Sequence, residues 1–154
     1  MRTGTRWLVA LSVTAGLVGL GAVSAEAATS PAHRSTCTGT VKITSFAFVP
    51  ATVARGQSST ATLKARNCTG TVQQTTTYWY GHFSGPGTGI PAGCPVIDPL
   101  PRPLAFTAHG TGSLQTTYRV FPTCTATSLT ITVRVVGSGG TVLASRNATL
   151  AITT

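Results

Sequence analysis

The sequence predicts an all-β protein, an immunoglobulin-like antiparallel β-sandwich of about seven strands with two disulfides. Segments in which apolar and polar side chains alternate recur along the chain, and turns rich in Gly, Pro, Ser and Asn separate them. After residue 27, no segment has the period of an amphipathic helix. The four cysteines are an even number in a chain whose N-terminus indicates export, and this favours two disulfides.

The N-terminal residues have the three-part layout of a secretory signal peptide. Arg2 and Arg6 are basic, residues 7–23 are apolar, and Ala25 and Ala27 supply the small side chains that a signal peptidase requires. A permanent membrane anchor is disfavoured, because the apolar run is short and is followed by a processing site instead of stop-transfer charges. We therefore expect a secreted, extracellular protein with no membrane attachment after signal cleavage. The expected organisation is a signal peptide over 1–27, a polar lead over 28–36 and the sandwich domain over 37–154.

The first half of the expected domain contains three strand-like segments. The first ends at Pro50, and its apolar phase changes between Ile43 and Phe46, which predicts a β-bulge. A turn over 52–59 follows, and then the segment 60–67, in which every second side chain is apolar, as in a half-buried strand. The segment 71–80 is rich in β-forming residues and predicts the third strand.

The second half opens with a long irregular segment over 81–103, which is rich in Gly and Pro and is expected to be a loop. Two alternating segments follow. The first places Leu114, Thr116, Tyr118 and Val120 on one face, and the second places Leu129, Ile131, Val133 and Val135 inward. "GSGG" predicts a hairpin turn before a last strand over 141–152.

The order of these strands also predicts how the cysteines pair. If successive strands alternate in direction, Cys37 and Cys68 lie at one end of the sandwich, and Cys94 and Cys124 lie at the other. Of the three pairings that four cysteines allow, only Cys37–Cys68 with Cys94–Cys124 needs no bond across the length of the sandwich. No two cysteines are close enough in sequence to form a zinc-binding pair.

The segment "FVPATVARGQSSTATLKARNCTGT", residues 48–71, resembles the opening of bacterial cell-surface immunoglobulin-like modules of the CARDB type. The shared features are a proline, a turn that begins with glycine, an alternating strand and a corner that contains Asn. The resemblance implies the sandwich fold and does not imply a particular function.

The composition argues against an enzyme. Asp98 is the only acidic residue after the signal peptide, so catalysis by paired carboxylates is excluded. Asp98 could form a catalytic triad with His82 or His109 and a serine, but the sequence contains no nucleophile elbow. His33, His82 and His109 lack the spacing of a metal-binding pair, and no cofactor fingerprint occurs. We therefore expect a non-enzymatic protein with no cofactor and no metal.

The formal net charge is +9, and it is +8 once Arg2, Arg6 and Glu26 leave with the signal peptide. The basic residues are widely spaced along the sequence, and no nucleic-acid recognition motif accompanies them. This pattern favours a soluble secreted protein, with loose attachment to an anionic cell-wall polymer as an alternative, and it argues against a specific nucleic-acid partner.

Three consecutive aromatic residues, Tyr78, Trp79 and Tyr80, lie near the end of the third expected strand. Because side chains alternate between the two faces of a strand, at least one of the three should point away from the core. The first interpretation is that Trp79 packs in the core, as strand aromatics commonly do. The alternative is an exposed platform for sugar rings or a protein, formed by Trp79 or by Tyr78 and Tyr80. Val72 is in phase with Tyr78 and Tyr80, and this phase favours these two inward and Trp79 outward.

The segment "GCPVIDPLPRPLAF", residues 93–106, together with "YRVFPTC" before Cys124, resembles the reactive-loop region of the bacterial subtilisin-inhibitor family. The resemblance implies that Val96 enters the primary pocket of a protease, that Ile97 follows the reactive bond and that Cys94–Cys124 holds the loop. The candidate binding loop consists of Pro95, Val96, Ile97, Asp98 and Pro99. Prolines and a disulfide order such a loop in advance and reduce the entropy that binding costs.

The sequence thus predicts a secreted binding or structural module that acts through residues 81–103 and 122–127, because sandwich folds often place recognition on the loops at one end. Its expected partner is an extracellular protein or a cell-wall polymer. One alternative is inhibition of a secreted serine protease through Val96–Ile97, and another is carbohydrate binding through Trp79.

Overall fold

The computed structural model describes residues 36–85, 89–98 and 100–154. The predicted signal peptide over 1–27 and the polar lead up to residue 35 lie outside the described residues. Pro99 of the candidate binding loop also lies outside them.

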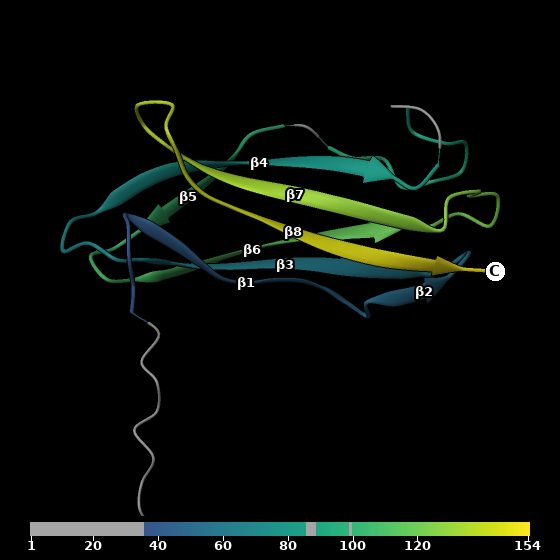
Figure 1. The fold of residues 1–154 in the computed structure, drawn as a ribbon, viewed down its shortest axis with the longest axis horizontal. Helices are drawn as coiled ribbons and strands as arrows, with labels where there is room; N and C mark the ends of the chain where they lie inside the picture. Colours follow the sequence, from purple (N-terminus) through teal and green to yellow (C-terminus); the bar gives the residue numbers. More distant parts are fainter. Residues whose placement is uncertain (1–35, 86–88, 99) are drawn as a thin grey trace, which may run out of the picture. The chain divides into compact units, whose positions relative to one another are not determined.

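The described residues form a sandwich of two β-sheets (Figure 1). A three-stranded sheet has the order β1-β3-β6, and a five-stranded sheet has the order β2-β8-β7-β4-β5. Neighbouring strands are antiparallel except for β2 and β8, which are parallel. The strands are β1 (Val41–Val49), β2 (Thr52–Ala54), β3 (Ser58–Asn67), β4 (Gln73–Phe83), β5 (Arg102–Phe106), β6 (Thr111–Arg119), β7 (Ser128–Gly137) and β8 (Val142–Thr153). The predicted fold class, an all-β sandwich with two disulfides, is confirmed.

Most of the predicted strand faces are also confirmed. The apolar side chains of β3 and β7 that were expected to face inward are buried between the sheets. The predicted bulge is present, because the pairing of β1 with β3 shifts its register between Ile43 and Ser45. These segments follow the two-residue period of a strand with one buried face, so their pattern alone determines which side chains enter the core.

Two strands were not predicted. The segment 52–54 was expected to be part of a turn, but it forms β2, which pairs with the C-terminal strand β8. Residues 102–103 were expected to end a loop, but they begin β5, in which Pro103 lies opposite Thr76 of β4. A proline is tolerated there because β5 is an edge strand and needs no hydrogen bond on its outer side. Each strand is short and depends on a partner that is distant in sequence.

Trp79 is the largest fully buried side chain, with 1% of its surface exposed. Its ring meets Phe46 of β1 edge to face at 5.1 Å between ring centroids, and its indole N–H donates to Thr77 Oγ1 at 3.2 Å. Trp79 therefore packs in the core, and the outward orientation that the phase of Val72 favoured is wrong. Val72 is indeed in phase with Tyr80, but both are exposed, whereas Thr75, Thr77 and Trp79 at the alternate positions of β4 are buried. An exposed aliphatic side chain at a strand end is a poor guide to the buried face.

The two disulfides are Cys37–Cys68 and Cys94–Cys124, the predicted pairing. At the end of the sandwich that holds Cys37–Cys68, the side chain of Asn67 is fully buried and satisfied. Its amide group donates to the carbonyl oxygens of Thr71 and Thr107, and its oxygen accepts from the backbone N–H of Thr69 at 2.9 Å. Asn67 therefore connects the β3–β4 corner to the β5–β6 turn.

Candidate binding site at the loop end

Two connections between strands form the region that we call the loop end. They are residues 84–101, which connect β4 to β5, and residues 120–127, which connect β6 to β7. In Figure 1 the β6–β7 connection and the first part of the β4–β5 connection lie at the end of the sandwich that also carries β2 and the C-terminus. The β4–β5 connection then returns along the edge of β4, because β5 pairs only with the first half of that strand. The predicted functional segments, 81–103 and 122–127, overlap this region.

The two connections of the loop end are joined at two places. Ser84 Oγ accepts hydrogen bonds from the backbone N–H groups of Thr127 and Ser128, at 2.9 and 3.0 Å. Further along the chain, the backbone N–H of Phe121 donates to the carbonyl oxygen of Gly93 at 3.1 Å, next to the Cys94–Cys124 disulfide. The irregular segment is therefore held by covalent and hydrogen bonds although it has no regular secondary structure.

Val96 projects from this held segment. Cys94 and Pro95 before it are buried, and Ile97 after it is partly buried against the core. The side chain of Ile97 occupies the space that a Cβ atom would need at Gly81, so the absence of a side chain at Gly81 allows Ile97 to pack on β4. By contrast, 75% of the surface of Val96 is exposed. An exposed valine between anchored neighbours is a feature that a binding partner can contact without a rearrangement of the loop.

Asp98 and Arg102 connect the loop to both sheets. Asp98 Oδ2 lies 3.3 Å from an Nη atom of Arg102, and Asp98 Oδ1 accepts from the backbone N–H of Leu100 at 2.9 Å. The Arg102 guanidinium lies 5.3 Å from the centroid of the Trp79 ring and donates to Thr116 Oγ1 of β6. Because the carboxylate is half exposed, the ion pair adds little stability by itself. It does fix the direction in which the loop returns to β5.

The sequence also contains a signal for two residues to which the prediction gave no role, Phe121 in the loop end and Arg102 at the start of β5. Phe121 is exposed, and its place directly after the inward-facing Val120 predicts an outward side chain. Its ring is covered in part by the guanidinium of Arg119, at 5.5 Å from the ring centroid. Arg102 is four residues from the only acidic residue of the expected domain, which makes it the nearest candidate for an ion pair.

The three aromatic residues proposed as a platform do not lie on one face. Trp79 is in the core and presents no exposed ring to a sugar. Tyr78 and Tyr80 lie on the outer face of the five-stranded sheet, stacked at 6.5 Å between centroids, and Arg134 of β7 lies 5.1 Å from the ring of Tyr80. This cluster faces away from the core.

Tyr118 is buried below the loop end, and its ring packs against Phe48 of β1. Burial raises the pKa of Tyr118 to about 12, although the positive charge of Arg102 opposes the shift and Asp98 adds to it slightly. The phenol is thus held in its neutral form by the apolar interior.

Within residues 36–85, 89–98 and 100–154, no three or more His, Cys, Asp or Glu side chains are arranged to hold a metal ion. The same described residues contain no helix of the length and hydropathy needed to cross a membrane.

No protein-family model matches the sequence, and no curated protein matches it either. The solved structures that are similar to this chain include two at 13% sequence identity. One is an alkylpurine DNA glycosylase of Pseudomonas fluorescens bound to DNA, with a TM-score of 0.48 over 77% of this chain and 32% of that chain. The other is a Niemann-Pick type C2 protein from the Japanese carpenter ant, with a TM-score of 0.46 over 77% of this chain and 97% of that one. The chain thus spans about a third of the length of the glycosylase.

Replacement of Tyr118 by Phe should change how stability depends on pH. The raised pKa means that the folded state keeps a proton that the unfolded state loses near pH 10. The stabilisation is therefore complete below pH 10 and is lost as the pH rises toward about 12. Between pH 8 and pH 11, the free energy of unfolding measured with urea should fall by about 1 kcal/mol more in the unaltered protein than in Tyr118→Phe. Equal losses in the two proteins would contradict this assignment.

Proposed function

We propose that the protein is a secreted, non-enzymatic binding module that recognises another extracellular protein through the loop end. The observation that carries the proposal is the exposure of four large apolar side chains on these two connections, Ile90, Val96, Leu100 and Phe121. Exposed apolar surface on a soluble domain commonly marks a site of protein contact, and the Cys94–Cys124 disulfide joins the two connections that carry these side chains. Aromatic side chains such as Phe121 are frequent among the residues that dominate binding energy.

The order of the loop end supports the same proposal. A loop that is already fixed by a disulfide and by backbone hydrogen bonds loses less conformational entropy when it binds than a mobile loop does. The resemblance of residues 48–71 to cell-surface immunoglobulin-like modules agrees with a role outside the cell. Two disulfides suit an oxidising compartment, and the signal-peptide pattern of residues 1–27 supports secretion.

The test compares apolar residues at the two ends of the sandwich. Oxidised protein is immobilised and exposed to the medium into which it is secreted, alongside the variant Val96→Ser/Phe121→Ser and the control Val72→Ser/Val142→Ser. Val72 and Val142 are also exposed, but they lie away from the loop end. Loss of the loop-end side chains should lower the affinity for a retained partner by about ten-fold or more, and the control should not. Equal binding by all three proteins would contradict the proposal.

A second function, inhibition of a serine protease, is favoured by one specific observation. Val96 projects between the buried Pro95 and the anchored Ile97, within a segment fixed by Cys94–Cys124. In such an inhibitor Val96 would fill an apolar primary pocket, and the Val96–Ile97 bond would lie at the catalytic serine. Because Ile97 packs against the core and Cys94 is crosslinked, both sides of a cut bond would stay in place. The resemblance of residues 93–106 to the subtilisin-inhibitor loop supports the same assignment.

Titration against subtilisin-like and elastase-like proteases tests this second function. The oxidised protein should inhibit one of them stoichiometrically, with slow cleavage at Val96–Ile97. Val96→Asp should weaken inhibition by more than about a hundred-fold, since a carboxylate would enter an apolar pocket, whereas Val72→Asp should have no effect. Full protease activity with an intact protein would exclude inhibition and leave the binding module as the function to be pursued.

A further inference from the structure

The fold gathers four of the basic residues that are spread along the sequence. On the outer face of the three-stranded sheet, Lys42 of β1 lies directly opposite Arg66 of β3, and Lys64 lies one row further along β3. The bulge of β1 lies next to these residues, between Ile43 and Ser45. Arg146 of β8, in the other sheet, donates to the carbonyl oxygen of Thr44 in this bulge at 3.3 Å. We refer to Lys42, Lys64, Arg66 and Arg146 as the basic cluster.

Within the described residues, nothing of opposite charge balances the basic cluster. Asp98 is the only acidic side chain there, and it pairs with Arg102 on the other sheet. Like charges on directly opposed residues of neighbouring strands, such as Lys42 and Arg66, destabilise a sheet. Lys42 Nζ donates to the carbonyl oxygen of Thr36 at 3.2 Å, and an anion bound across the strands would offset the repulsion that remains between the like charges.

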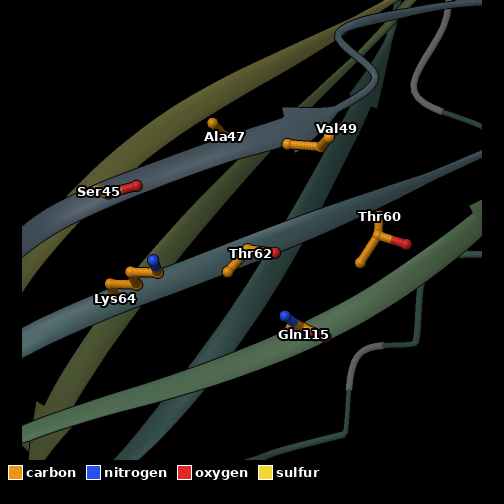
Figure 2. Close-up of a pocket in the computed structure, with 7 residues that line it drawn as sticks. All are labelled: Ser45, Ala47, Val49, Thr60, Thr62, Lys64 and Gln115. Atoms are coloured by element: carbon orange, nitrogen blue, oxygen red, sulfur yellow. The ribbon is translucent and has the colours of Figure 1, made fainter. Parts of the chain in front are cut away.

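Hydroxyl and amide groups surround the basic cluster along the same face. Lys64 borders two shallow hollows, of about 510 and 370 Å³. The larger hollow is shown in Figure 2, with Lys64 at one end of a row on β3, and its other lining residues are Ser45, Ala47, Val49, Thr60, Thr62 and Gln115. The smaller hollow is lined by Lys64 with Thr44, Ala65, Thr111, Gly112 and Ser113. Short hydroxyl side chains both donate and accept hydrogen bonds, so they suit a ligand that is itself rich in hydroxyl groups.

We infer that this face of the three-stranded sheet binds an anionic glycan, a chain of sugars that carries carboxylate groups. The basic cluster would pair with the carboxylates, and the hydroxyl-lined hollows would accept the sugar hydroxyls beside them. Lys64 and Arg66 are two residues apart on one strand, so their Cα atoms are separated by roughly 6.8 Å along the face, and each can pair with a different carboxylate of a linear chain.

A single-stranded nucleic acid fits this face less well than a glycan. Proteins that bind single strands stack the bases on aromatic side chains. The outward positions of β1, β3 and β6, all of which the structure describes, carry Lys, Arg, Ser, Thr, Gln and small apolar residues but no aromatic residue. The inference does not depend on the loop end, because the basic cluster lies on a different surface.

Binding of the oxidised protein to polygalacturonate, a linear polyuronate, tests the inference. The polymer should bind saturably, neutral dextran of the same length should not, and the affinity should fall as salt rises, because exposed charges are screened. Single-stranded DNA of similar charge should bind at least about ten-fold more weakly than the polyuronate. Failure to bind polygalacturonate, or equal affinity for the DNA, would overturn the assignment.

Two double variants of equal net charge separate the basic cluster from a general effect of charge. Lys64→Ser/Arg66→Ser should weaken polygalacturonate binding by about ten-fold or more. Arg55→Ser/Arg134→Ser removes two charges away from this face, one in the β2–β3 connection and one on the outer face of the five-stranded sheet, and should weaken it by less than about three-fold. Equal losses in the two variants would show that only the net charge matters and would overturn the inference.

The variant Arg66→Glu distinguishes a loss of glycan binding from a loss of folding. The new carboxylate would lie opposite Lys42, so an attraction replaces a repulsion and the melting temperature should not fall. Binding of polygalacturonate should nevertheless be lost. A variant that folds as well as the unaltered protein and still binds with the same affinity would contradict the inference.

Discussion

The Cys94–Cys124 disulfide is the constraint on which the loop end depends. It joins the long β4–β5 connection to the β6–β7 connection, along which the chain passes from the three-stranded to the five-stranded sheet. Closing a loop of 30 residues removes much of the conformational freedom of the unfolded chain, an effect worth roughly 3–4 kcal/mol. Without this bond, a segment rich in Gly and Pro would rest on a few backbone hydrogen bonds, and the exposed apolar side chains would have no fixed positions.

Packing against the core also holds the β4–β5 connection in place. Trp79 fills the space between the sheets next to Phe46, and Arg102 covers one face of its ring while it pairs with Asp98. The glycine at position 81 leaves room for Ile97 to pack on β4. Each of these contacts connects the return of the β4–β5 connection to a residue that cannot move without disturbing the core. The rigidity of the loop therefore comes from packing as well as from the disulfide.

Much of the fold follows from local pattern. Alternation in residues 61–65 and 129–135 gave the correct buried faces, and the strand order gave the correct cysteine pairing, because both depend only on periodicity and direction. The phase of Val72 favoured the wrong orientation for Trp79, because Val72 is apolar but exposed and lies before β4 begins. The strands β2 and β5 were missed because each is short and forms only against a partner that is far away in sequence.

The candidate surfaces differ in how far the sequence could reveal them. The loop of residues 95–98 was recognisable from its prolines and cysteine. The exposure of Val96 could not be predicted, because it depends on the packing of Ile97 against Gly81. The basic cluster could not be predicted, since the register of β1 with β3 and the reach of Arg146 across the sandwich bring its members together. Widely spaced charges in a sequence give no information about their spacing on a sheet.

Hydrogen exchange of the loop-end amides tests most directly whether the disulfide orders the binding surface. The amide of Phe121, which donates to Gly93, is compared in the oxidised protein and in Cys94→Ser/Cys124→Ser, with the amide of Cys68 as the internal reference. The Phe121 amide should exchange at least about ten-fold more slowly when the disulfide is present, and the Cys68 amide should be unchanged. Equally fast exchange of Phe121 in both proteins would show that the disulfide does not order the loop end and would contradict the account.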